Sequence, residues 1–247
     1  ANDYLEYRIL QAIYLSDTVA VNTYIKEYIS GGYTQIHQQL SEKQKLLILL
    51  QSIEGNNQGL NIKLYIPEHL SGTKDGLYVF TLSEADGTPW YSHKEHGTVY
   101  FAPDIYLEEP FLGMKIALVR DIVSDTNYNQ RLGVLRVDID LKDIRETLQN
   151  AAITPNAVTY LINEENVIIA ASDDKKMAQL GLDQSIPDVF SYDKWADSDA
   201  MMPGVLDREK VYFMRDKIQN TDWEMITIIP QSDMFDDVAR VQGTVLI

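Results

Sequence analysis

The sequence LGVLRVDIDL, residues 132–141, combines two kinds of local structure in one short stretch. Five of the eight residues 132–139 are Leu, Val or Ile, which is typical of a buried strand. Asp140 then stands directly before Leu141–Asn150, where an acidic residue can cap the first turn of a helix. We therefore predict a buried strand that leads straight into a short helix.

Similar strand signals precede this stretch. Met114–Val123 is a second β-branched run, and the polar segment Ser124–Asn129 joins it to the strand at 132–139, so the two form a predicted hairpin. Leu60–Ile66 alternates between apolar and polar residues, which is the period of a strand. Leu77–Phe80 and Thr98–Ala102 are shorter strand candidates. These strands predict an antiparallel sheet in the first half of the chain.

A second set of strands follows Pro155, which we take as the boundary between two halves. The strands predicted there are Val158–Ile162, Val167–Ala171, Met201–Leu206, Val211–Arg215 and Trp223–Ile229. Lys175–Leu180 is a short helical turn between them. Strands outnumber helices in each half and the connections are short, which favours an antiparallel α+β class over a doubly wound α/β fold.

Helices are predicted at both ends of the chain. Asp3–Ser30 contains neither Pro nor Gly and carries Ile9 and Ile13 on one face, which predicts a single helix about 42 Å long. A second helix, Thr34–Gln51, follows, and a last one covers Gln231–Ile247. The apolar face predicted for the second helix consists of Ile36, Leu40, Leu47 and Leu50. Both terminal helices read as parts of longer helices.

The composition excludes several classes of function. The chain has 37 acidic and 21 basic residues, a net charge of −16, and therefore no basic surface for nucleic acid. It has no cysteine, which excludes disulfides and thiolate zinc sites. No apolar run reaches the roughly 18 residues of a membrane span. His93 and His96 lack further ligands, so we expect no metal and no cofactor.

Catalytic motifs are absent as well. The chain contains no G-x-S-x-G elbow, P-loop, H-E-x-x-H or G-x-G-x-x-G sequence, so we do not expect this segment to be an enzyme. An unrecognised site built from carboxylates is the remaining enzymatic alternative.

The order of these local patterns resembles the double-Cache extracellular sensor domain, and most closely those of YesM-like bacterial sensor histidine kinases. The segments that carry the resemblance are Leu60–Ile66, the pair Trp90-Tyr91, Met114–Ile122, residues 132–141, Tyr160–Ala170 and Trp223–Pro230. The resemblance implies a long N-terminal helix followed by two PAS-like subdomains with antiparallel sheets.

The resemblance also implies a division of the chain. Residues 1–52 would form an N-terminal helical stalk with the second helix, and residues 53–150 the membrane-distal PAS-like subdomain. Residues 151–230 would form the membrane-proximal subdomain, and residues 231–247 a C-terminal helix that leads to a second membrane span. The chain would then be an extracellular segment between two transmembrane helices of a cell-membrane receptor.

The function implied is that of the ligand-sensing domain of a two-component sensor histidine kinase. A small molecule would bind the distal subdomain and displace a helix that continues through the membrane. The receptor would be a homodimer with the Ile9–Ile13 face as its interface, and its kinase part would act on a cytoplasmic response regulator. The ectodomain of a chemoreceptor and a free-standing extracellular binding protein are the alternatives.

Candidate ligand-binding residues also follow from the resemblance. Trp90 and Tyr91 match an aromatic pair of the amino-acid-binding branch, Tyr106 a later Tyr, and Asp138 the Asp of the strand at 132–139, which could hold an ammonium group. Tyr100 is a further aromatic candidate. Each has a structural alternative: the aromatic residues could simply pack in a core, and Asp138 could be a cap or an ion-pair partner.

The motif of that branch is incomplete here. Thr88 stands where an Arg is expected, and Ser83 stands in place of a Tyr, so we do not predict an α-amino acid as the ligand. The sequence does not identify the ligand: an amine or an amino-acid-like molecule is a candidate, and sensing of a partner protein without a small molecule is the alternative. Arg120, on a neighbouring strand, is a candidate replacement for the missing cation, with an ordinary salt bridge as its alternative.

Overall fold

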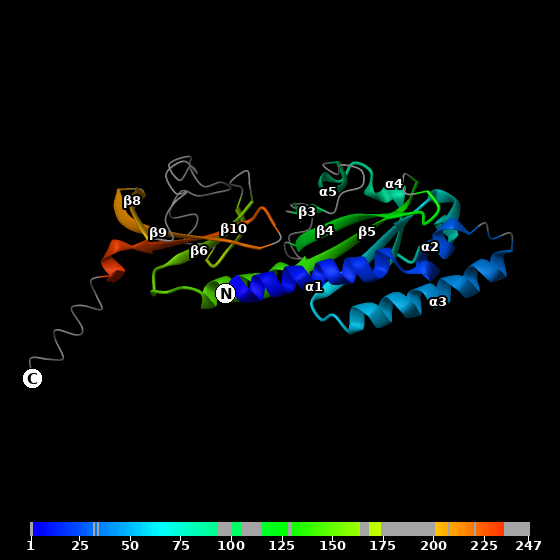
Figure 1. Cartoon of the computed structure of the whole chain (residues 1–247), viewed down its shortest axis with the longest axis horizontal. Coiled ribbons are helices and arrows are strands. Elements are labelled where there is room, and N and C mark those ends of the chain that lie inside the picture. The colour runs from blue at the N-terminus through cyan, green and yellow to red at the C-terminus, as the bar shows by residue number, and fades with distance from the viewer. Residues whose placement is uncertain are drawn as a thin grey trace, which may run out of the picture. The chain divides into compact units, whose positions relative to one another are not determined.

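The structure is a computed structural model, and it divides into two compact units (Figure 1). The first unit consists of Ala1–Tyr7 and Lys142–Ile247, and the second of Arg8–Leu141. The residues described are 2–31, 33, 35–92, 100–104, 115–127, 130–163, 168–173, 201–206, 208–219 and 221–234. The predicted turn Lys175–Leu180, His93 and His96 lie outside this part of the chain.

The N-terminal helix is interrupted, so the prediction of one helix over Asp3–Ser30 is wrong. Helix α1 covers Asn2–Ala20 and helix α2 covers Thr23–Ser30. The break lies at Asn22, whose backbone is extended and whose side chain accepts a hydrogen bond from Ile25 N at 3.2 Å. An Asn in this conformation satisfies a free amide of the next helix, which makes the second start stable.

Helix α3 covers Ile36–Gly55, close to the predicted range, but its buried face differs from the prediction. Ile36 and Leu40 are 74% and 50% exposed, whereas Leu46 and Leu50 are buried. The buried residues lie in the second half of the helix, and the predicted stripe therefore overestimates how much of α3 contributes to the core.

The second unit contains a five-stranded sheet in the order β2-β1-β5-β4-β3. Its strands are β1 Leu60–Ile66, β2 Val79–Thr81, β3 Tyr100–Asp104, β4 Lys115–Val123 and β5 Arg131–Asp140. All neighbours pair antiparallel except β1 and β2, which are parallel. The hairpin predicted between β4 and β5 is confirmed. A side chain at Gly133 would have its Cβ 2.7 Å from Tyr65 O, so β5 needs glycine there to lie against β1.

The two faces of this sheet have different partners. The long helices cover one face, and the short helices α4 (Leu82–Ala85) and α5 (Pro89–Ser92) cover the other (Figure 1). A 3₁₀ helix, Glu68–Thr73, joins β1 to the chain before β2. We call the face covered by α5 the Trp90 face. Its described strand residues include Lys63, Tyr65, Ala117, Val119, Val134, Arg136 and Asp138, by the strand registers.

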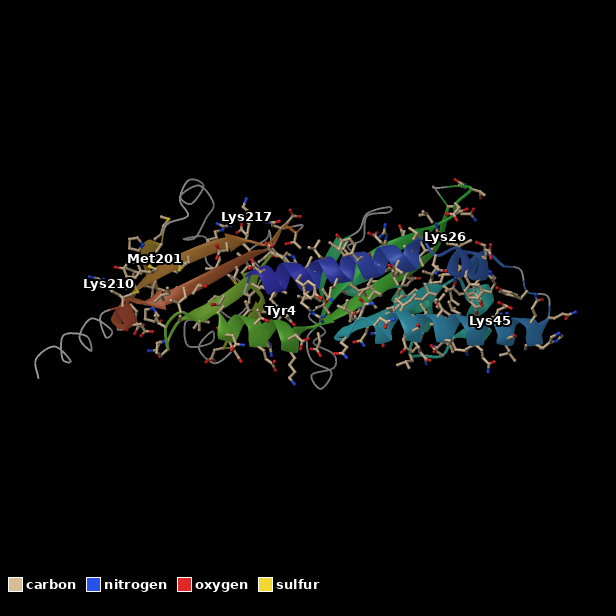
Figure 2. All side chains as sticks on the ribbon, turned by 60° about the horizontal axis from the view of Figure 1, so that its bottom comes forward. Tyr4, Lys26, Lys45, Met201, Lys210 and Lys217 are labelled. Carbon is tan, nitrogen blue, oxygen red and sulfur yellow. The ribbon has the colours of Figure 1, made fainter. Side chains whose placement is uncertain are left out.

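The first unit has its own five-stranded sheet in the order β7-β6-β10-β9-β8. Helix α6, Leu141–Asn150, precedes it, as predicted. Its strands are β6 Val158–Ile162, β7 Ile168–Ala171, β8 Met202–Leu206, β9 Glu209–Lys217 and β10 Glu224–Pro230, all antiparallel. Lys210 and Lys217 lie near the two ends of β9 (Figure 2).

One helical turn, residues 231–234, follows β10, and the rest of the predicted helix Gln231–Ile247 lies outside the described residues. Asp233 in this turn accepts hydrogen bonds from Thr154 Oγ1 at 2.6 Å and from Asn156 N at 2.8 Å. Within the described ranges, no helix is both long and apolar enough to span a membrane. The predicted α+β class, with a helix leading into two sheets that are mainly antiparallel, is confirmed.

Candidate ligand-binding site

Helix α5 places Trp90 over the sheet of the second unit. The chain reaches it through α4, whose start is fixed by Glu84: its Oε2 accepts hydrogen bonds from Thr81 N at 2.8 Å and from Thr81 Oγ1 at 3.0 Å. Thr88 Oγ1 donates to Ala85 O at 2.6 Å, directly before α5. Thr88, which stands at the position of the expected Arg, therefore stabilises the turn that carries Trp90.

Trp90 belongs to an aromatic cluster. It is 2% exposed and packs with Tyr65, Ala117, Val119 and Val134 of the strands. The ring centroids of Trp90 and Tyr65 are 5.0 Å apart, and those of Trp90 and Tyr91 are 5.6 Å apart in an edge-to-face arrangement. Phe80 stacks on Tyr65, with ring centroids 5.3 Å apart. Aromatic pairs at these distances favour a fixed arrangement.

A charged group lies directly beside this cluster. Asp138 is completely buried, and its Oδ1 accepts a hydrogen bond from Arg136 Nε at 2.5 Å. Arg136 is 2% exposed, and its guanidinium carbon lies 5.0 Å from the centroid of the Trp90 ring, a cation–π contact. The Lys63 Nζ lies 3.1 Å from Asp138 Oδ2. Two cations thus contact one carboxylate under Trp90.

Several predicted site residues come together here, and others do not. Trp90, Tyr91 and Asp138 lie on the Trp90 face or on α5 above it. The backbone of Tyr100 pairs with that of Val119, which belongs to the same cluster. The side chain of Tyr100 and all of Tyr106 lie outside the described part of the chain.

Arg120 lies apart from these residues. It pairs in the sheet with Leu135, so it belongs to the opposite face, and its guanidinium forms an ion pair with Asp17 of α1. Its Nη1 also lies 3.4 Å from Ser16 Oγ. Arg120 connects the sheet to α1, and the structure supports the ordinary salt bridge that was its alternative.

Sequence reasoning missed the two cations of the site, Arg136 and Lys63. A signal for Arg136 was present: it stands two residues before Asp138 in a predicted strand, and such residues point to the same face. Lys63 was also in a predicted strand, but only the register of β1 against β5 places it directly opposite Arg136. That pairing is not encoded in either segment alone.

The site combines an aromatic wall with charges of both signs, which suits a small polar molecule better than an apolar one. Within the described residues no group of three or more His, Asp or Glu side chains is arranged to hold a metal ion. The arrangement offers hydrogen-bond donors from Arg136 and Lys63 and an acceptor at Asp138.

Comparison with solved structures identifies the architecture. The chain is similar to the extracellular domain of rpHK1S-Z16, described as a histidine kinase, with 9% sequence identity and a TM-score of 0.60 over 94% of this chain and 90% of that one. The ligand-binding domain of the Pseudomonas fluorescens chemoreceptor CtaA in complex with L-alanine is 16% identical, with a TM-score of 0.56 over 95% of this chain and 92% of that one. The chain has the double-Cache fold.

A third double-Cache structure matches equally well. The sensory domain of the Campylobacter jejuni chemoreceptor Tlp3 (CcmL) is 17% identical, with a TM-score of 0.56 over 93% of this chain and 87% of that one. No family model matches the sequence, and no curated protein matches it significantly. Since kinase and chemoreceptor domains both match, the double-Cache fold is shared by both kinds of receptor and does not single out YesM-like kinases.

Proposed function

We propose that the chain is the extracellular ligand-sensing domain of a bacterial transmembrane two-component sensor histidine kinase. The second unit, Arg8–Leu141, is the membrane-distal half and binds a small molecule at the Trp90 face. The first unit is the membrane-proximal half. The double-Cache fold supports this proposal, because the matching structures are extracellular domains of a kinase and of chemoreceptors.

The observation that carries the proposal is the charged cluster under Trp90. Arg136 and Asp138 are 2% and 0% exposed. Burying charges costs free energy, and hydrophobic residues of similar volume often stabilise a core equally well. Lys63 and Arg136 also stand directly opposite each other on β1 and β5, a like-charge pair that destabilises a sheet. Because these buried charges do not favour folding, we infer that they serve to bind a ligand.

A route from the site to the helices exists within the second unit. Val119 of β4 packs with Trp90, and the next residue, Arg120, forms the ion pair with Asp17 of α1. A ligand that shifts β4 at Val119 would therefore also move Arg120, and through its ion pair with Asp17 it would act on α1. We infer that this coupling displaces α1 and signals to the kinase and its cytoplasmic response regulator.

The homodimer of the intact receptor needs an exposed helix face. Ile9 is 2% exposed and Ile13 is half-buried, so the predicted Ile9–Ile13 face is occupied by the chain's own core. Tyr14 of α1 is 66% exposed and is available to a second copy. Disulfide cross-linking of the receptor in membranes should be efficient for Tyr14→Cys and poor for Ile9→Cys. Equal cross-linking at both positions would contradict this interface.

A chemoreceptor ectodomain is the second candidate. Two of the three domains compared above belong to chemoreceptors, and one of them is in complex with L-alanine. The full-length gene distinguishes the candidates, because a kinase and a chemoreceptor have different cytoplasmic parts. A gene that encodes no membrane span would contradict both and favour a free-standing binding protein.

The binding function is tested by thermal unfolding of the 247-residue chain with a panel of organic acids, amino acids, amines and sugars. We expect at least one class to raise the Tm, and Asp138→Ala to remove that shift. Glu224→Ala, which breaks a buried ion pair in the first unit, is the control and should keep it. An unchanged shift in Asp138→Ala would remove the Trp90 face from the proposal, and a panel without any shift would contradict small-molecule sensing.

A further inference from the structure

The junction between α1 and α2 interrupts the backbone hydrogen bonds of the helix. Asn22 N donates to Val19 O at 3.2 Å, three residues back, so α1 closes with a tight last turn. Ile25 N donates to the Asn22 side chain instead of to Val21 O, which would be its acceptor in a continuous helix. A helix is stiff because these bonds run along its axis, so the two helices can change their relative angle at Val21–Asn22.

Helix α2 is fixed on the sheet of the second unit by large side chains. Ile25, Tyr28 and Ile29 are at most 2% exposed. The helix packs closely on β5 and on α3. Gly133 of β5 lies next to Ile29, because a Cβ on this glycine would be 3.5 Å from Ile29 Cδ1. Bulky side chains that interdigitate with a strand resist sliding, so α2 should move together with the sheet.

The buried face of α1 before the junction contains smaller side chains. Its members from residue 12 onward are Ala12, Leu15, Ser16, Val19 and Ala20. Three of these five are Ala or Ser, and the three lie four residues apart, on one side of the helix. Small side chains project little into neighbouring grooves, so a short slide of α1 meets less steric resistance than a slide of α2.

Two ion pairs lie on either side of the junction. Asp17 of α1 pairs with Arg120 of β4, and Arg120 follows Val119 of the aromatic cluster. Lys26 of α2, labelled in Figure 2, pairs with Asp125 in the turn between β4 and β5. Strand β4 therefore holds α1 directly beside the candidate site, whereas α2 is held at the hairpin turn.

We propose that Val21–Asn22 is a hinge at which α1 moves while α2 stays on the sheet. A shift of β4 reaches α1 through Arg120 and Asp17, and the hinge confines the movement to α1. Helix α1 includes residues of both units, Asn2–Tyr7 of the first and Arg8–Ala20 of the second, whereas α2 belongs to the second alone. This inference rests on the proposed sensing function and specifies where the displaced helix separates from the rest of its unit.

Amide hydrogen exchange of the 247-residue chain without ligand tests the hinge, with variants that leave both helix sequences unchanged. Arg120→Met removes the cation that holds α1 and should speed exchange in Leu15–Ala20 about two- to fivefold, the effect of one exposed ion pair. Exchange in Ile25–Ser30 should not change. Asp125→Asn is the matched control: it weakens the pair with Lys26 and should speed exchange in α2 alone.

Distances between spin labels test the movement itself. The chain has no cysteine, so labels attach only at introduced ones. Thr18 on α1 and Glu27 on α2 are exposed, and the exposed Lys45 of α3 (Figure 2) is the reference for both. Arg120→Met should shift or broaden the distance distribution of Thr18→Cys with Lys45→Cys by about 1–2 Å. The distribution of Glu27→Cys with Lys45→Cys should stay the same.

The outcomes separate the hinge from the sensing function. Equal changes in both helices with either variant would mean that α1 and α2 move as one body, and would overturn the hinge. Arg120→Met without any effect on α1 also overturns it, because the ion pair then does not hold this helix. Both measurements use the chain without ligand, so they leave the sensing function intact. A thermal-unfolding panel without any shift contradicts that function and leaves the hinge in place.

Discussion

The two sheets of this protein have the same strand order but carry different charged and aromatic side chains on their faces. In each, the last strand in the sequence, β5 or β10, lies at the centre, next to the first strand of its sheet. Each central strand contributes an acid to a buried ion pair, Asp138 with Arg136 and Glu224 with Arg215. In the first unit Arg215 contacts Glu224, whereas in the second unit Asp138 contacts both Arg136 and Lys63.

The surroundings of the two pairs differ as well. The buried core beside Glu224 consists mainly of aliphatic residues, with Tyr160 and Phe213 as its aromatic members. The cluster beside Asp138 contains Trp90 and Tyr65, with Phe80 and Tyr91 packed against it. The second cation on the carboxylate and the contact between Trp90 and Tyr65 are the features that distinguish the second unit from the first.

The largest effect is expected from removing the aromatic wall. Trp90→Ala deletes a buried side chain and should lower the free energy of unfolding of the second unit by about 4 kcal/mol. Phe213→Ala, which also deletes a buried aromatic side chain, should cost the first unit about 3 kcal/mol. Urea unfolding measures both losses. Only Trp90→Ala should abolish ligand binding, and loss of binding in Phe213→Ala with a folded second unit would break the comparison.

Breaking the ion pairs should have the next largest effect. Arg136→Met removes one of the two described cations that contact the buried Asp138. It should lower the free energy of unfolding by about 3 kcal/mol, near the low end for a broken buried ion pair, because Lys63 still contacts Asp138. Arg215→Met should cost a similar amount in the first unit, where Glu224 is also buried. Calorimetric titration with a ligand should detect no binding to Arg136→Met and normal binding to Arg215→Met. The reverse pattern would assign the site to the first unit.

The support of Trp90 by α4 should have a smaller effect. Glu84→Ala removes the hydrogen bonds from Glu84 to Thr81 at the start of this helix and the ion pair with Lys74. We expect a loss of about 1 kcal/mol in unfolding free energy and a weaker ligand affinity, because the chain that carries α5 becomes less fixed. Glu146→Ala is the control, since the contact of Glu146 with Lys142 in α6 is long, at 3.9 Å, and exposed. An unchanged ligand affinity in Glu84→Ala would show that α4 does not support the binding site.

The smallest expected effect is a loss of stability of the second unit at low pH. The pKa of Glu84 is lowered mainly by its hydrogen bond with Lys74, and the pKa of Glu68 mainly by the backbone N–H of Ser83. A carboxyl with a lowered pKa in the folded state stabilises the protein above its unfolded pKa of about 4.3. This stabilisation is lost as the pH falls through the folded pKa. Because both groups are accessible to water, the loss should stay within about 1 kcal/mol.

Thermal unfolding between pH 6 and 3 measures this loss. Glu68→Gln combined with Glu84→Gln should reduce the acid sensitivity of the second unit. The same sensitivity in this variant and in the parent chain would assign it to other carboxylates.

Local patterns in the sequence predicted most strands of both sheets, because each is a run of alternating or β-branched residues with turn residues at its ends. The break between α1 and α2 was missed because Asn22 interrupts an otherwise continuous helical pattern through its side-chain cap. The exposure of Ile36 was missed because the stripe on α3 does not record how far the sheet extends beneath it.

The candidate site was predicted only in part. Trp90 and Asp138 were named through the family resemblance and lie close together, whereas Arg120, named as the candidate cation, lies on the opposite face and Arg136 lies beside Asp138. Both arginines lie in predicted strands, and only the alternation of side chains relative to Asp138 distinguishes them. The position of Lys63 depends on the pairing of β1 with β5, a long-range contact that a single sequence does not specify.

The central claim is that the Trp90 face of the second unit binds the ligand. A crystal structure of the chain with a saturating concentration of a ligand found in the thermal-unfolding panel tests it most directly. The account predicts ligand density beside Trp90, within hydrogen-bond distance of Arg136 or Asp138. Density at the sheet of the first unit, with the Trp90 face unchanged, would contradict it.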